Sequence, residues 1–224
     1  MATLMLRIAA PLQSWGSESK FNIRGTEREP TKSGIIGMIA AAMGIQREDI
    51  SNRIEQLSKL RFGVRVEREG KLIKDFHMVH EYKKGKEGNS YITERYYLSD
   101  AVFLVALESD DKELLEWIDE ALKNPVFPLF LGRRSCPPTL PIVMGLTDES
   151  LVDSLKKWHD LVENDTGYKR LTYESIVGGR IIHDIPVSFS QLHRKHEYRY
   201  KKEEIMVVNK AVLAGNEHDP MAEL

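Results

Sequence analysis

An alternation of apolar and polar residues predicts several β-strands along this chain. In residues 3–8 the apolar side chains fall on one side, which is the period of two expected of a half-buried strand. Residues 101–107 are instead continuously apolar, as expected of a central strand covered on both faces. The remaining strands are predicted at residues 62–66, 72–79, 91–98, 127–131 and 142–146, with short ones near 171 and at 181–189.

Helical periodicity appears between these strands. Apolar residues recur at helical spacing in residues 31–45, where Thr31 or Ser33 is the expected N-cap. The other helices are predicted at residues 49–60, 110–123 and 148–159.

The order of these elements predicts the fold. Strand, helix, strand, strand, helix, strand is the order of the ferredoxin-like split βαβ fold, which RNA-recognition modules share. We therefore expect an α+β protein with a ferredoxin-like (RRM-like) βαββαβ domain at residues 1–145. Residues 72–98 would form a long β-hairpin with a flexible tip at Gly85 and Gly88. Residues 146–224 are expected to form a smaller C-terminal lobe packed on this domain.

Composition limits the class of protein. The 224 residues, 42% of them hydrophobic, are enough for a packed core. The single cysteine, Cys136, excludes an internal disulfide and a cysteine-based zinc site, and it fits a reducing cytoplasm. We find no signal peptide pattern and no apolar stretch near the ~20 residues that span a bilayer. We therefore expect a cytoplasmic protein without a membrane segment.

The net charge of −2 alone argues against a nucleic-acid partner, but the charges are unevenly distributed. Residues 108–120 hold seven acids and one lysine, whereas residues 193–202 hold five bases, two histidines and one acid. Bases also exceed acids in residues 20–34, four to two, and in residues 71–97, six to four. Either these are ordinary solvated faces, or an acidic helix and basic loops give the molecule one cationic face.

The first candidate site surrounds the start of the helix at residue 31. Before it stands PLQSWG, in which Gln13 and Trp15 offer a polar and a stacking group beside glycine. A loop with Arg24 leads to PTKSG, where Lys32 adds a cation and Ser33 a hydroxyl donor. The free N–H groups of a helix N-terminus suit phosphate, although the pattern is not a Walker A loop. The alternative is an ordinary capped helix.

Two further segments add cations. The segment LGRRSCPPTLP places Arg133 and Arg134 after a glycine at a strand end, where guanidinium groups bind phosphate bidentately. Alternatively, both arginines pair with the acids of a neighbouring helix. The hairpin combines aromatic residues and cations, among them Tyr82, Lys84 and Arg95, so rings can stack on unpaired bases while cations follow the backbone. Its alternative is a solvated hairpin with tyrosines packed on its own base.

Together these motifs resemble one family. PLQSWG, PTKSGIIGMIAAAMGIQRED, the hairpin and LGRRSCP follow one another over about the first 145 residues, and this combination is similar to the CasD family. That family is the fifth-family subunit, of the RAMP superfamily, in the type I-E CRISPR surveillance complex Cascade.

The resemblance implies a non-catalytic subunit, without cofactor or metal, that serves antiviral defence. It would have a ferredoxin-like body with a thumb hairpin, cap the foot of the complex and hold the 5′ handle of the CRISPR RNA. Its partners would be the CRISPR RNA, the adjacent backbone subunit and the large subunit, with target DNA contacted only indirectly. By position, the resemblance implies RNA contacts at Gln13, Trp15, Lys32, Ser33, Arg133 and Arg134, and on the thumb at Tyr82, Lys84 and Arg95.

Two other functions stay open at this point. A related type I-C branch cleaves precursor CRISPR RNA without metal, which requires a base and an acid. The side chains that would have to supply them are Lys74, His77, His80 and Tyr82. The last possibility is a protein-only scaffold with incidental basic loops.

Overall fold

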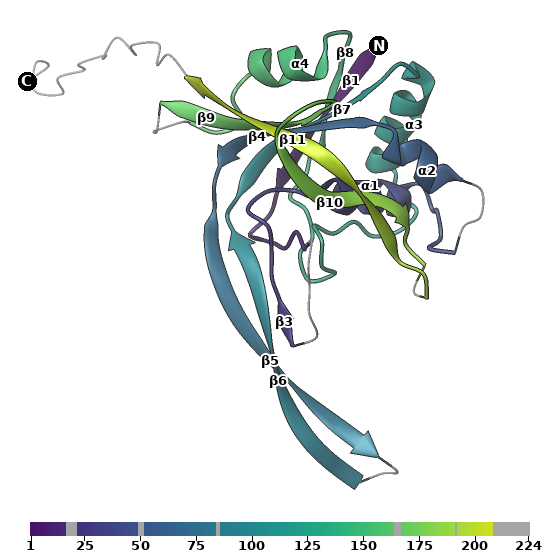
Figure 1. The fold of residues 1–224 in the computed structure, drawn as a ribbon, viewed down its shortest axis with the longest axis vertical. Coiled ribbons are helices and arrows are strands. Elements are labelled where there is room, and N and C mark those ends of the chain that lie inside the picture. The colour runs from purple at the N-terminus through teal and green to yellow at the C-terminus, as the bar shows by residue number, and fades with distance from the viewer. Residues whose placement is uncertain (17–21, 49–51, 84–85, 164–166, 191, 208–224) are drawn as a thin grey trace, which may run out of the picture.

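One seven-stranded antiparallel sheet carries the other elements of the fold (Figure 1). The computed structural model describes residues 1–16, 22–48, 52–83, 86–163, 167–190 and 192–207. The strands of this sheet are β1 (Ala2–Ala9), β4 (Arg61–Arg68), β7 (Val102–Ser109), β8 (Val143–Thr147), β9 (Tyr168–Ser175), β10 (Arg180–Ser188) and β11 (Lys195–Val207). Their order in the sheet is β10-β11-β9-β4-β7-β1-β8. The expected α+β class is confirmed.

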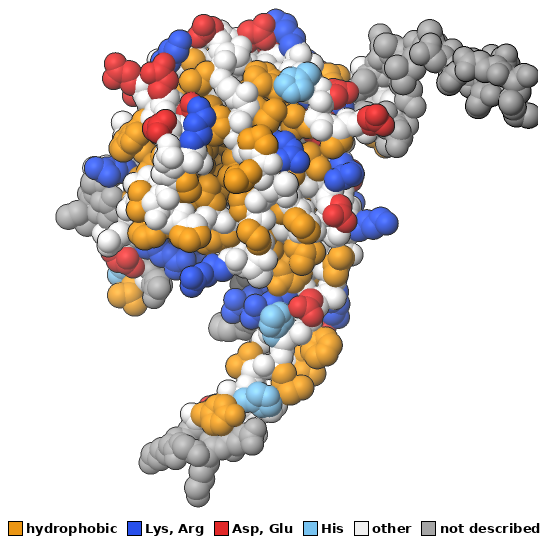
Figure 2. Space-filling view, turned by 180° about the vertical axis from the view of Figure 1, so that it is seen from behind, with side chains coloured by type: hydrophobic (Ala, Val, Ile, Leu, Met, Phe, Trp, Pro, Cys, Tyr) orange, Lys and Arg blue, Asp and Glu red, His pale blue; other side chains and the backbone are white. Residues whose placement is uncertain are grey.

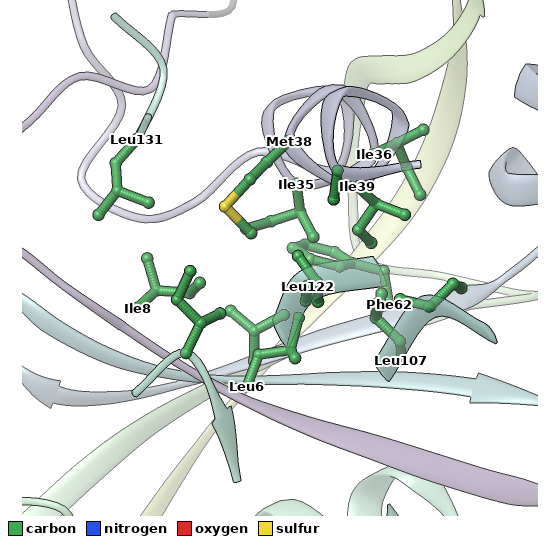
Figure 3. Close-up of a cluster of buried hydrophobic side chains, with 14 of the residues drawn as sticks. Leu6, Ile8, Ile35, Ile36, Met38, Ile39, Phe62, Leu107, Leu122 and Leu131 are labelled. Atoms are coloured by element: carbon green, nitrogen blue, oxygen red, sulfur yellow. The ribbon is translucent and has the colours of Figure 1, made fainter. Parts of the chain in front are cut away.

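Helices cover both faces of this sheet. They are α1 (Lys32–Ala42), α2 (Arg53–Ser58), α3 (Lys112–Lys123) and α4 (Leu151–Lys157). The main core lies between the sheet and α1 to α3, and Figure 3 shows Ile35 and Ile39 of α1 facing Leu6 of β1. All three side chains are fully buried, and such burial contributes about 1.5–3 kcal/mol for each. α4 packs on the opposite face in a second, smaller core.

The first helix begins where the sequence predicts. The Thr31 hydroxyl accepts a hydrogen bond from the Gly34 N–H (3.2 Å), so Thr31 and not Ser33 is the N-cap. The predicted helices at 110–123 and 148–159 correspond to α3 and α4. The helix predicted at 49–60 is shorter, since α2 covers Arg53–Ser58 and residues 49–51 lie outside the described part.

The predicted strand at residues 127–131 is wrong. The N–H groups of Val126 and Phe127 donate instead to the carbonyls of Ala42 and Ala41 at the end of α1 (2.9 and 3.3 Å). Pro128 has no N–H to donate to a ladder. The position beside β1 is taken by β8, close to the strand predicted at 142–146.

One long strand has no counterpart among the predicted elements. β11 reads KHEYRYKKEEIMV, in which charged residues outnumber apolar ones, so no apolar alternation marks it. It is a strand because it lies between β10 and β9 and pairs with both. Through the pairing of β9 with β4, the C-terminal strands continue the sheet that the N-terminal part begins.

The predicted hairpin is confirmed and projects from the body (Figure 1). Its strands are β5 (Lys71–Lys83) and β6 (Lys86–Ser99), which pair along their length. At the root of the hairpin, β6 also pairs with the short strands β2 (Leu12–Gln13) and β3 (Ile23–Arg24). The hairpin is thereby tied to the segment that precedes α1.

A buried ionic cluster joins the two parts of the sheet. The Glu67 carboxylate on β4 bonds both the Arg65 guanidinium and the Lys169 ammonium of β9, and all three side chains are at most 1% exposed. Removing one partner from such a cluster leaves buried charge without compensation.

We expect Glu67→Gln to destabilise the protein by up to about 3–5 kcal/mol, because the buried Arg65 and Lys169 then share only the partly exposed Asp160 as counter-ion. Urea unfolding followed by circular dichroism measures this change. The matched control is Glu204→Gln, which breaks an exposed pair with Lys156 and is expected to cost less than about 1 kcal/mol. Equal losses for the two variants would contradict this account of the sheet junction.

Candidate nucleic-acid interface

An open pocket of about 770 Å³ lies where segments distant in sequence meet. Its walls come from the chain after β2, from β3, from the start of α1, from the loop at Gly132 and from the β10–β11 hairpin. The volume is within the range of ligand-binding pockets, about 300–1,000 Å³. We call it the basic pocket. Among the described residues that line it, none carries a carboxylate, and Arg24, Arg133 and Arg194 carry positive charge.

Close backbone approach brings the sequence motifs to this pocket. The Trp15 ring lies on Gly34 at the start of α1, where an added Cβ would stand 2.8 Å from the indole. Gly132 has φ +83°, and a Cβ there would stand 1.6 Å from the Ser14 carbonyl oxygen. The Ser14 N–H donates to the Leu131 carbonyl (3.2 Å). Glycine is therefore required at both 34 and 132 for PLQSWG, PTKSG and LGRR to meet.

Arg133 is placed on the pocket wall by an aromatic ring. Its guanidinium lies over the Tyr97 ring, 4.6 Å from the centroid, and its Nη2 donates to the Arg24 carbonyl (2.8 Å). Its Nη1 is buried and has no hydrogen-bond partner among the described residues. A buried donor of this kind is costly unless a ligand accepts from it.

Arg95 adds a second guanidinium of the same kind at the hairpin root. Its Nε is also buried without a partner among the described residues. Arg95 is the register partner of Arg24 in the parallel pair of β3 and β6. Like charges placed opposite each other on neighbouring strands repel, so an anion between them would be stabilising. Figure 2 shows lysine and arginine side chains gathered on the lower edge of the body, beside the hairpin.

The β10–β11 hairpin supplies nitrogen-bearing side chains that the predicted site lacked. His183, Arg194 and His196 line the same pocket as Arg24 and Arg133. Burial lowers the pKa of His196, and the nearby Arg194 and His183 lower it further. The excess of bases in residues 193–202 covers Arg194 and His196 but gives no position in space, and it does not include His183.

Of the predicted contacts, Trp15, Arg24, Ser33 and Arg133 line the basic pocket, but Trp15 is only 1% exposed and its indole N–H is bonded to Gln13, which does not favour stacking on a base. Arg134 follows directly and is exposed, with no ion pair to a carboxylate among the described residues. The alternative in which the twin arginines pair with the acids of a helix therefore has no support in the described part of the chain.

Gln13 and Lys32 face the protein interior instead. Gln13 is fully buried, donates to the Ala101 carbonyl (2.7 Å) and accepts from the Trp15 indole N–H (3.0 Å). Lys32 is 1% exposed, and its ammonium pairs with Glu174 (2.9 Å). Burial lowers the pKa of Lys32 in spite of this partner. RNA contacts by these two side chains stay predictions that this arrangement does not favour.

The N-terminus of α1 is also occupied. The Lys32 N–H donates to the Asp184 carboxylate (2.9 Å), and the Gly34 N–H donates to the Thr31 hydroxyl. Asp184 in turn holds Arg199 through two bonds. Phosphate binding by these backbone groups is not favoured here, and the alternative of a capped helix describes this end better.

The predicted hairpin contacts are spread over its length. Arg95 lies at the root, near the pocket, whereas Tyr82 lies toward the far end and is 69% exposed. Lys84 lies outside the described residues. The hairpin therefore offers a second surface, separate from the basic pocket.

The side chains considered for RNA cleavage do not converge. Lys74 is paired with Glu94, and this bond raises its pKa, the wrong direction for a general base. His77 points to the opposite face of β5 from Lys74 and His80, because strand side chains alternate. Lys74 and His80 are separated by about 20 Å along the strand at roughly 3.3 Å per residue.

The described residues contain no group of three or more histidine, cysteine, aspartate or glutamate side chains placed to hold a metal ion. Within the same part of the chain, no helix has the length and apolar character needed to cross a membrane.

Arginines around a pocket whose described lining has no carboxylate, one of them lying over the Tyr97 ring, are typical of surfaces that bind a sugar-phosphate chain. The family described as CRISPR-associated protein (Cas_Cas5) matches residues 3–201, and the chain belongs to this family. The CRISPR system Cascade subunit CasD of Escherichia coli (strain K12) is 34% identical over 164 residues, which cover 66% of this chain and 72% of that protein. The assignment to the CasD family made from the motifs is thus confirmed.

Solved structures give the same result. A structure described as a CRISPR RNA-guided surveillance complex contains a chain with a TM-score of 0.78 and 31% identity, covering 99% of this chain and 97% of that one. A crystal structure of a Cas protein matches with a TM-score of 0.72 and 38% identity, covering 92% and 95%.

We expect Gly132→Ala to destabilise the protein by at least about 1–3 kcal/mol, since it combines a positive φ with a Cβ placed on the Ser14 carbonyl. Thermal unfolding measures the loss. Gly25→Ala is the matched control on the same pocket, because its Cβ would meet nothing within 4 Å. An unchanged midpoint for Gly132→Ala would show that the loop does not depend on this close approach.

Proposed function

We propose that this protein is a non-catalytic, RNA-binding subunit of a type I-E CRISPR surveillance complex, Cascade. The observation that carries the proposal is the basic pocket, beside which two guanidinium groups have buried donors without partners among the described residues. Membership of the Cas_Cas5 family and the likeness to a Cascade subunit support it. A sugar-phosphate chain would accept from these donors.

The RNA segment we infer is the 5′ handle of the CRISPR RNA. The basic pocket would hold the sugar-phosphate backbone of this RNA through Arg24 and Arg133, with Ser33 as a hydroxyl donor. The exposed Arg134 would add a contact beside the pocket. The exposed hairpin would act as the thumb, with Tyr82 toward the neighbouring backbone subunit. The large subunit would be the further partner, target DNA would be contacted only indirectly, and the complex would act in the cytoplasm in antiviral defence.

We further infer that the N-terminal body is ferredoxin-like. In support, the order βαββαβ is formed by β1, α1, β4, β7, α3 and β8, when the short elements and the β5–β6 hairpin between them are set aside. The four strands lie in the sheet in the order β4-β7-β1-β8. The division into an N-terminal domain at 1–145 and a smaller C-terminal lobe stays a prediction. The pairing of β4 with β9 means that the two segments would share one sheet.

We expect Arg133→Ala with Arg134→Ala to weaken binding to CRISPR repeat RNA from the same genome. The dependence of log affinity on log salt concentration should become shallower by about 0.7 for each phosphate group that the variant no longer neutralises. Fluorescence anisotropy at several salt concentrations measures both quantities. If loss of the Arg133 guanidinium from the Tyr97 ring perturbs folding, the single variant Arg134→Ala is measured in place of the double variant.

Lys112→Ala is the control for charge alone, because Lys112 is exposed on α3, outside the pocket lining. It should leave affinity and salt dependence unchanged. A double arginine variant that behaves like Lys112→Ala would favour the protein-only scaffold and would overturn the proposed RNA site.

We also expect no cleavage of repeat RNA by the purified chain in EDTA, because Lys74, His77 and His80 do not converge. Denaturing gel electrophoresis of end-labelled RNA tests this. Specific cleavage that is lost in His77→Ala or His80→Ala would establish the endoribonuclease alternative instead.

A further inference from the structure

The side of the basic pocket formed by the β10–β11 hairpin is built from two histidines and an arginine. His183 lies on β10, His196 on β11, and Arg194 just before β11. The two imidazole centroids are 5.9 Å apart, with their planes at 75°. All three side chains line the same cavity as Arg24 and Arg133. No RNA contact was predicted from the sequence in this part of the chain.

The orientation of His183 is fixed by two contacts. Its Nε2 lies 2.9 Å from the His196 carbonyl oxygen, which can only accept, so Nε2 carries the proton. Its ring stacks on Tyr198, 4.4 Å between centroids and 27° between planes. These two contacts fix the His183 ring beside the backbone of His196.

We propose that the β10–β11 hairpin forms the second wall of the RNA site, where Arg194 and His196 bind a backbone phosphate, His183 holds the His196 segment in place, and His196 takes up a proton on binding. This inference rests on the proposed function and deepens it, since it names the groups and the charge state that complete the site.

The charges around the pair favour a phosphate ligand. Arg194 lies next to His196 on its own segment, and Arg24 and Arg133 lie across the cavity. Among the described residues, the carboxylate that acts on His196 is Asp184 of β10, which is already bonded twice by Arg199.

An anion would therefore change the protonation of His196. Without a ligand, burial and the neighbouring cations hold the pKa of His196 below its usual value, so the ring is neutral at neutral pH. A phosphate group would supply the missing opposite charge and raise this pKa in the complex. A pKa that is higher in the complex than in the free protein means proton uptake on binding. Affinity is then greatest below the free pKa and falls as pH rises through the pKa of the complex.

The test measures binding of a short single-stranded oligouridylate to the full chain at about pH 6 and about pH 8, where uracil and phosphodiester groups do not titrate. We expect tighter binding at the lower pH, by up to about tenfold for each unit by which the ligand raises the pKa of His196. The double variant His183→Gln, His196→Gln should lose most of this pH dependence. His159→Gln, an exposed histidine outside the cavity lining, is the matched control and should keep it.

Arg194→Ala tests the same wall without involving the histidines. It should weaken binding several-fold at both pH values and make the salt dependence shallower. Circular dichroism of each variant confirms that the sheet is intact, and Arg194 is exposed, so its removal leaves the core unchanged.

The outcomes separate this inference from the proposed function. If Arg133→Ala weakens binding but Arg194→Ala and the histidine variants bind as the unchanged protein does, with the same pH dependence, the second wall is refuted and the RNA site stands. If Arg133→Ala also binds normally, the RNA site itself is refuted. Cleavage of the oligonucleotide that disappears in His183→Gln would overturn the binding role of the pair in favour of a catalytic one.

Discussion

The packing of Trp15 against Gly34 is the contact on which the candidate site depends. The indole is held from one side by Gln13, which itself is anchored on the Ala101 carbonyl, and a side chain at position 34 would leave the ring no room. The carbonyl of Ser14, which precedes Trp15, packs against Gly132. This contact fixes the next residue, Arg133, over the Tyr97 ring. The hairpin root, the first helix and the arginine loop are therefore fixed relative to one another by close backbone contacts. These contacts require glycine, and larger residues would separate the walls of the pocket.

The distribution of charge explains how a chain with net charge −2 can offer a cationic pocket. Many of its acids are paired inside the molecule. Glu29 accepts from Thr172 and Lys201 and pairs with Arg170, and these partners hold its pKa below the usual value in spite of burial. Glu174 and Asp184 neutralise Lys32 and Arg199 in the same way. Within the described part of the pocket lining, the arginines form no ion pair with a carboxylate. The nearby carboxylates already have other partners.

The C-terminal strands have a role beyond extending the sheet. Because β9 pairs with β4, the β10–β11 hairpin is carried to the start of α1, where Asp184 accepts from the Lys32 N–H. The same placement brings His183 and His196 to the cavity opposite Arg133. The contacts that join these strands to α1 thus also hold His183 and His196 at the pocket.

The sequence by itself determined the local elements and the family. Period-two and period-3.6 patterns marked most strands and helices, Thr31 was among the two expected caps, and the ordered motifs led to the CasD resemblance. Tertiary structure alone decided that residues 127–131 are irregular, that the charged segment of β11 is a strand, and that Gln13 and Lys32 are buried. It also decided that His183, Arg194 and His196 meet Arg133. The physical reason is that side-chain periodicity reports which face of an element is buried, whereas strand partners and ion pairs are chosen by packing between residues distant in sequence.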